Sequence, residues 1–129
     1  MTVTIAELVA ISTSMQNRFA QLFETLGRWV ATTDDPETQQ RFARNAHRHA
    51  WHAELWAARR PTVPIEAVRP SLADVEIDAQ LGDGAARSAW YDEQIELLRS
   101  ELTDLHRRVD PQLDPGTARV ISLISADLA

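Results

Sequence analysis

Three of the chain's four histidines fall within one short stretch, at positions 47, 49 and 52, and they are the side chains best suited to chemistry. Imidazole changes its protonation state near neutral pH, so it serves in proton transfer, and it is also a common metal ligand. His49 and His52 are three residues apart, which places them on the same side of a helix. Glu54 follows closely and adds a carboxylate. The candidate catalytic residues are therefore His49, His52 and Glu54.

His49 has two interpretations. At roughly 100° per residue it lies inside the apolar stripe of a helix, with Asn45 and His52 at the edge of that stripe. As a core residue it would be hydrogen-bonded to Ser12, Gln16 or a backbone carbonyl, because buried polar groups normally have partners. Alternatively it faces a cavity, and the candidate ligand-binding residues are then Ser12, Gln16, Asn45, Arg48, His49 and Tyr91.

Arginines form a second line along the same helix. Arg41, Arg48 and Arg59 share this line, and Arg44 is adjacent to it. A guanidinium group binds a carboxylate or phosphate through two parallel hydrogen bonds, so the line could hold a small anion. The alternative is a charged helix face that is balanced by acidic residues of a neighbouring helix.

An apolar strip lies almost opposite the first stripe and contains Trp51, Leu55 and Ala58. Apolar strips that stay open to solvent are uncommon in monomers. The strip is expected either to form a homodimer or heteromeric contact through Trp51 and Leu55, or to be covered by another part of this chain.

Composition limits the classes of function. The chain has 129 residues and no cysteine, which indicates one domain and excludes thiolate chemistry. All 13 basic residues are arginine, so lysine Schiff-base chemistry is excluded. The net charge of −6 argues against nucleic acid or an anionic membrane as the main partner. There is no secretion-signal pattern and no apolar run of membrane-spanning length, so a cytoplasmic location is expected.

The hydrophobic periodicity that positions these residues is helical throughout. It predicts helices over residues 4–30, 36–59, 85–109 and 115–129, in a single domain. The predicted inward faces include Ile5 and Phe23 on the first helix and Tyr91 on the third, with Asp127 at the edge of the fourth. Asp35 followed by Pro36 is typical of a helix start. Residues 61–84 contain three prolines and several apolar side chains, which favours an ordered crossover. The connections are therefore short, long and short, which predicts an all-α four-helix bundle with the crossover between the second and third helices.

This order of connections resembles that of the ferritin-like superfamily, and the sequence His49-Ala-Trp-His52 has the spacing of the Glu-x-x-His motif found there. The resemblance implies a di-metal site that needs inward-facing carboxylates on all four helices. No acidic residue lies in the inward phase of the first or third helix, and the fourth offers only Asp127. We therefore expect a ferritin-like bundle without the complete di-metal site.

Two classes of function follow. The first is a protein without metal or cofactor that binds a small molecule, such as a small anion, or serves as a partner subunit in a complex. The second is a histidine-dependent enzyme that uses the cluster His47, His49 and His52. Such an enzyme would be either a mononuclear metal oxidoreductase or a metal-free acid–base catalyst.

Overall fold

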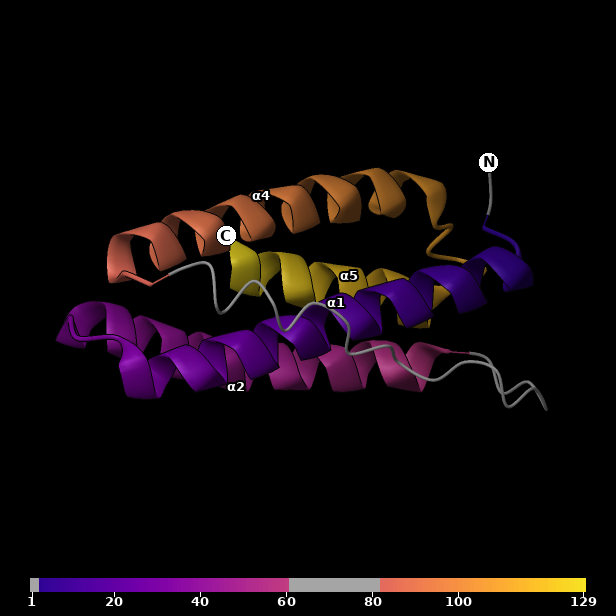
Figure 1. Ribbon diagram of the computed structural model, residues 1–129. Helices are drawn as coiled ribbons and strands as arrows, with labels where there is room; N and C mark the ends of the chain where they lie inside the picture. Colours follow the sequence, from indigo (N-terminus) through magenta and orange to yellow (C-terminus); the bar gives the residue numbers. More distant parts are fainter. Residues whose placement is uncertain (1–2, 61–81) are drawn as a thin grey trace.

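The computed structural model describes residues 3–60 and 82–129, and within these ranges it contains four α-helices and no strand. The helices are α1 (Ile5–Thr32), α2 (Pro36–Arg59), α4 (Gly84–Arg108) and α5 (Pro115–Leu128), with the labels of Figure 1. The predicted all-α fold with four helices is confirmed. Each helix begins and ends within two residues of its predicted position.

Every described helix begins in the same way. The residue before the first turn accepts a hydrogen bond from a backbone N–H three residues further on, at Thr4, Asp35, Asp83 and Asp114. Such a cap satisfies one of the N–H groups that have no partner inside the helix. In α2 and α5 a proline follows the cap, where its missing N–H costs nothing.

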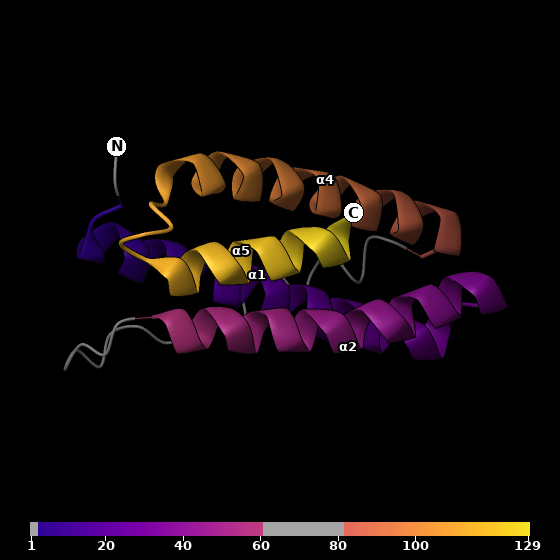
Figure 2. The same cartoon turned by 180° about the vertical axis from the view of Figure 1, so that it is seen from behind.

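The helices form two antiparallel pairs. α1 and α2 lie side by side, and α5 runs back along α4 (Figures 1 and 2). α4 begins beside the α1–α2 connection, where Arg87 Nη1 donates to Thr32 Oγ1 over 2.8 Å. It ends beside the start of α1, where Arg108 pairs with Glu7. α2 and α4 therefore run in the same direction. The predicted crossover falls mostly on residues 61–81, which lie outside the described ranges.

The core contains the predicted apolar faces of all four helices, with two corrections on α1. Ile5 is 73% exposed and Phe23 is 43% exposed, although both were predicted to point inward. Ile5 is the first residue of α1. Phe23 is adjacent to Leu22 and lies about 100° from it around the helix, and Leu22 is the one of the two that is buried.

The strip opposite the core face of α2 is only partly open. Trp51 is 42% exposed, whereas Leu55 is partly buried and packs against the core. Association through Trp51 and Leu55 therefore stays a prediction. None of the helices in the described ranges combines the length and apolar content needed to cross a membrane.

Two leucines on α4 test the phase of this helix. Leu102 is fully buried and Leu97 is 50% exposed. Leu102→Ala should lower the free energy of unfolding by about 2–5 kcal/mol, because it leaves a cavity in the core. Leu97→Ala, the matched control, should change it by no more than about 0.5 kcal/mol. Urea denaturation measures both, and equal losses would show that α4 is rotated from the orientation described.

Candidate functional site

The two histidines of α2 lie at the centre of the bundle, where three other helices reach them. His49 is 1% exposed and His52 is fully buried. Phe19 of α1 contacts both rings, with centroid separations of 5.6 Å to His49 and 5.1 Å to His52. Tyr91 comes from α4 and Asp127 from α5. His52 was predicted at the edge of the α2 stripe, but α5 covers that edge and buries it.

A continuous chain of hydrogen bonds joins these four residues. The Tyr91 hydroxyl lies 2.6 Å from His49 Nε2. His49 Nδ1 and His52 Nδ1 are 3.2 Å apart. His52 Nε2 lies 2.8 Å from Asp127 Oδ2. All four ring nitrogens of the two histidines are therefore hydrogen-bonded within this chain.

Chemistry fixes the direction of each hydrogen bond in this chain. A carboxylate only accepts, so His52 Nε2–H donates to Asp127. A neutral imidazole carries one N–H, so His52 Nδ1 accepts from His49 Nδ1–H. His49 Nε2 is then unprotonated and accepts from the Tyr91 hydroxyl. The chain thus runs in one direction, from Tyr91 to Asp127, with both histidines neutral.

Burial keeps the histidines in this neutral form. Desolvation, together with smaller contributions from the nearby His52 and Arg48, lowers the pKa of His49 to about 3. Burial also lowers the pKa of His52, although its hydrogen bond to Asp127 acts in the opposite direction. The contact between His52 and Asp127 is therefore a hydrogen bond from a neutral imidazole to a carboxylate. Burial raises the pKa of Tyr91 and keeps its hydroxyl protonated.

A polar cavity of about 190 Å³ lies above this chain, between α2, α4 and the last residues of α5. Both histidines, Tyr91 and Asp127 line it, together with three arginines of α2: Arg41, Arg44 and Arg48. Arg41 is paired with Asp92, so the guanidinium groups of Arg44 and Arg48 remain to be balanced by the side-chain carboxylate of Asp127. This excess of positive charge gives the cavity an electrostatic preference for anions.

The three arginines are held differently. Arg41 pairs with Asp92 of α4, and its guanidinium lies 4.8 Å from the centre of the Tyr91 ring. For Arg41 alone, this pair matches the predicted balance between the α2 arginines and the acids of the neighbouring helix, whereas Arg59 pairs with Asp114, which precedes α5. Arg44 and Arg48 are exposed, and neither forms an ion pair with a residue of the described ranges.

The structure brings together four of the six predicted ligand-binding residues, namely Asn45, Arg48, His49 and Tyr91, which all line the cavity. The other two lie elsewhere. The Ser12 hydroxyl is buried and has no hydrogen-bond partner among the described residues, and Gln16 accepts from Arg60 over 3.1 Å. The prediction that His49 bonds to Ser12, Gln16 or a backbone carbonyl is wrong, because α1 presents Phe19 to the histidine rings.

The predicted catalytic residues are only partly assembled. His49 and His52 share the cavity, whereas Glu54 is exposed and does not line it. His47 is also exposed. Sequence reasoning missed the role of Asp127 as the partner of His52, although it placed Asp127 at the edge of the inward face of the last helix. Only the packing of α5 against α2 shows that this edge faces the histidines.

The placement of the histidine and acidic side chains bears on metal binding. Among residues 3–60 and 82–129, no three histidine or acidic side chains are placed to hold one ion. The acidic residues of α1 and α4 are all exposed, in agreement with the predicted outward phase of these two helices.

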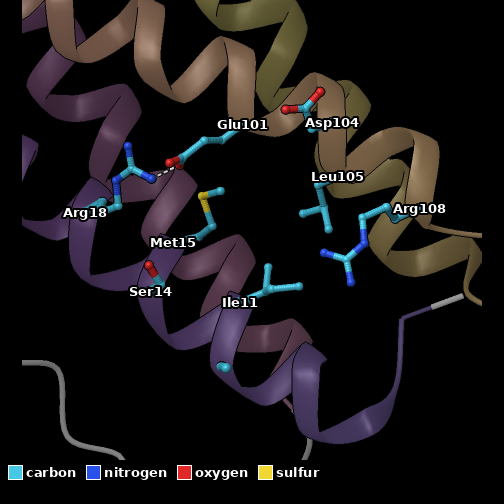
Figure 3. Close-up of a pocket in the computed structure, with 9 residues that line it drawn as sticks. Ile11, Ser14, Met15, Arg18, Glu101, Asp104, Leu105 and Arg108 are labelled. Atoms are coloured by element: carbon cyan, nitrogen blue, oxygen red, sulfur yellow. Dashed lines mark hydrogen bonds and ion pairs between the residues drawn. The ribbon is translucent and has the colours of Figure 1, made fainter. Parts of the chain in front are cut away.

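A second cavity, of about 360 Å³, lies between α1 and α4 and was not predicted (Figure 3). Ile11, Met15 and Leu105 form its apolar walls. Its two arginines are already paired, Arg18 with Glu101 across the cavity and Arg108 with Glu7. These ion pairs link α1 to α4, and they leave this cavity without the free positive charge of the first.

Comparison with known proteins finds no matching family model, curated protein or solved structure.

Replacing His49 should change how stability depends on pH. In the unfolded chain His49 takes up a proton near pH 6.5, whereas in the folded protein its pKa is about 3. The wild type should therefore lose about 1.4 kcal/mol of unfolding free energy per pH unit for this residue as the pH falls through this window. His49→Gln should have a shallower slope by about one proton, because glutamine does not titrate. It should also lose about 1–3 kcal/mol at pH 7, from the broken hydrogen bonds.

His47→Gln is the matched control, since His47 lies on the same helix but is exposed. Chemical denaturation between pH 7 and pH 4 measures all three proteins. If the wild type and His49→Gln gave parallel curves, His49 would not be held neutral by burial.

Proposed function

We propose that this protein binds a small anionic molecule in the arginine-lined cavity above His49 and Tyr91. The observation that carries this proposal is the charge of the cavity lining, in which Arg44 and Arg48 stand against the one side-chain carboxylate of Asp127, while Arg41 is paired with Asp92. Arg44 and Arg48 are exposed, line the cavity and form no ion pair with a described residue, and in this proposal their guanidinium donors hold the ligand. A carboxylate or phosphate fits these donors, because guanidinium groups bind such oxygens through charge-assisted hydrogen bonds.

The size of the cavity narrows the class of ligand. Its volume of about 190 Å³ is below the roughly 300–1,000 Å³ that is common for drug-sized ligands. A short carboxylic acid or a small phosphate ester suits this space better than a nucleotide. Asn45 supplies an additional polar group in the lining, which can orient the uncharged part of such a molecule.

For the whole chain we propose a ferritin-like topology without the complete di-metal site. α2 ends beside the start of α5, where Arg59 pairs with Asp114, and α4 starts beside Thr32 at the other end of the bundle. The end of α2 and the start of α4 therefore lie at opposite ends of the bundle, which is the placement that a ferritin-like topology requires. The exposed acids of α1 and α4 support the absence of a full carboxylate set.

Among the enzyme alternatives, the hydrogen-bonded chain favours metal-free acid–base catalysis over a mononuclear metal centre. Each nitrogen of His49 and His52 already has a partner. A proton-transfer role uses these contacts, whereas metal ligation by either ring would have to break one of them.

Anion titrations test the binding proposal. Acetate, malonate and inorganic phosphate are titrated into the full chain, with isothermal titration calorimetry and the imidazole NMR signals of His49 and His52 as readouts. At least one anion should bind and shift these signals. The double variant Arg44→Gln/Arg48→Gln should weaken binding by about tenfold or more, since hydrogen bonds to charged groups contribute about 1.5–3 kcal/mol.

Arg119→Gln is the matched control, because Arg119 is exposed on α5 outside the cavity, and it should bind like the wild type. The proposal fails if none of the three anions binds at low ionic strength. It also fails if the double variant and the control bind with the same dissociation constant.

A further inference from the structure

The hydrogen-bonded chain has two different ends. At one end the Asp127 side chain is 31% exposed. At the other end Tyr91 is 2% exposed and lines the cavity. A hydroxyl has one hydrogen to donate and two lone pairs that can accept, and Tyr91 gives its hydrogen to His49. Its oxygen therefore keeps the capacity to receive a proton from a molecule in the cavity.

The chain has a second arrangement that satisfies it equally well. If Tyr91 receives a proton and passes its own to His49 Nε2, His49 Nδ1–H moves to His52 Nδ1, and His52 Nε2–H moves to Asp127 Oδ2. Every hydrogen bond then reverses direction, and both histidines are neutral again. No charged imidazole remains in the buried site in either arrangement, so burial does not penalise one against the other at the histidines.

We propose that this hydrogen-bonded chain of four side chains removes a proton from a small carboxylate bound in the cavity. The proton comes from a carbon atom next to a carbonyl group. The proposal rests on the anion-binding function and adds the substrate class and the reaction. Tyr91 is the catalytic residue, because its oxygen receives the proton. His49, His52 and Asp127 are positioning residues that act through Tyr91 and transfer its displaced proton.

The step balances without any oxidant, reductant or co-reactant. The C–H bond of the bound molecule breaks, and its proton forms an O–H bond on Tyr91. The original Tyr91 proton leaves for His49, and one proton arrives on the Asp127 carboxylate at the end of the chain. The electron pair of the C–H bond moves to the carbonyl oxygen and gives an enolate. Reversal of the same transfers returns a proton to carbon.

Removal of a proton from carbon requires a base that is positioned beside the C–H bond. Protons on oxygen or nitrogen exchange with water without help, whereas a C–H bond next to a carbonyl exchanges slowly unless a base is positioned beside it. The enolate also carries its new charge on oxygen. Arg41 and Arg48 line the same cavity as Tyr91 and can stabilise that charge as it develops. The arginines thus have two roles, in holding the carboxylate and in stabilising the enolate.

Deuterium exchange tests the proposal directly. Pyruvate and 2-oxobutyrate are incubated with the full chain in D₂O, and NMR follows the replacement of hydrogen by deuterium at the carbon next to the keto group. Exchange should be faster than in buffer and proportional to the protein concentration. Asp127→Asn should reduce the protein-dependent rate by about 100-fold or more, because an amide accepts a hydrogen bond but does not take up the proton.

Binding measured on the same samples separates this proposal from the function on which it rests. Asp127→Asn should bind pyruvate at least as tightly as the wild type, since it removes a negative charge from the cavity. A residue that only supported the fold would change binding and exchange together. Tyr91→Phe keeps the ring that packs in the core and provides a second test if Asp127→Asn is poorly folded. His47→Gln is the matched control and should exchange at the wild-type rate.

Three results would overturn the proposal. The first is a wild-type protein that binds both 2-oxo acids without accelerating their exchange, which would leave the anion-binding function intact. The second is acceleration that survives in both Asp127→Asn and Tyr91→Phe. The third is a wild-type protein that binds neither these acids nor acetate, malonate or phosphate, in which case the binding function fails together with the reaction.

Discussion

Two imidazole rings buried side by side at the centre of a small bundle impose the constraint that organises this structure. A buried polar atom without a partner costs free energy of about 1–3 kcal/mol, and the pair presents four ring nitrogens. α2 alone can satisfy only the contact between the two rings. The two outer nitrogens need a hydroxyl from α4 and a carboxylate from α5. The positions of Tyr91 and Asp127 along their helices are therefore coupled to the histidines, which ties three helices to one polar chain.

The surroundings of this chain explain why it stays neutral. Phe19 of α1 covers both rings from one side and removes water from them. Desolvation then outweighs the favourable carboxylate next to His52, and the positive charge of Arg48 acts in the same direction as desolvation by disfavouring a charged His49. With Asp127 ionised the hydrogen bonds run from Tyr91 to Asp127, and one proton added at Asp127 would reverse all of them, which separates this arrangement from an ordinary buried ion pair. The chain is thus suited to moving a proton and not to storing a charge.

Charge on the outer side of α2 complements the neutral interior. Arg41 is fixed by Asp92 and by the Tyr91 ring, so it belongs to the framework of the cavity. Arg44 and Arg48 follow on the next turns of the helix and line the opening. Elsewhere arginines are used to join helices, as in the pairs of Arg18 with Glu101 and Arg108 with Glu7. The difference between these two uses distinguishes the candidate site from the rest of the charged surface.

Local signals in the sequence determined the helices themselves. Caps such as Asp35 and Asp114, each followed by a proline, mark helix starts through contacts within one turn, so no tertiary information is needed to find them. The helical period also placed His49 inside and Tyr91 on the core face of its helix, because a residue at the centre of an apolar stripe is buried whatever packs against it. Only the tertiary structure determines whether residues at the edge of an apolar stripe are buried. His52 and Asp127 lie at the edges of the apolar stripes of their helices and are 75 residues apart in the sequence. Only the packing of α5 against α2 buries His52 and brings the two side chains into hydrogen-bond contact. The hydrogen-bond partner of a buried polar group depends on which helix packs against it. The hydrophobic periodicity of a single helix does not contain that information.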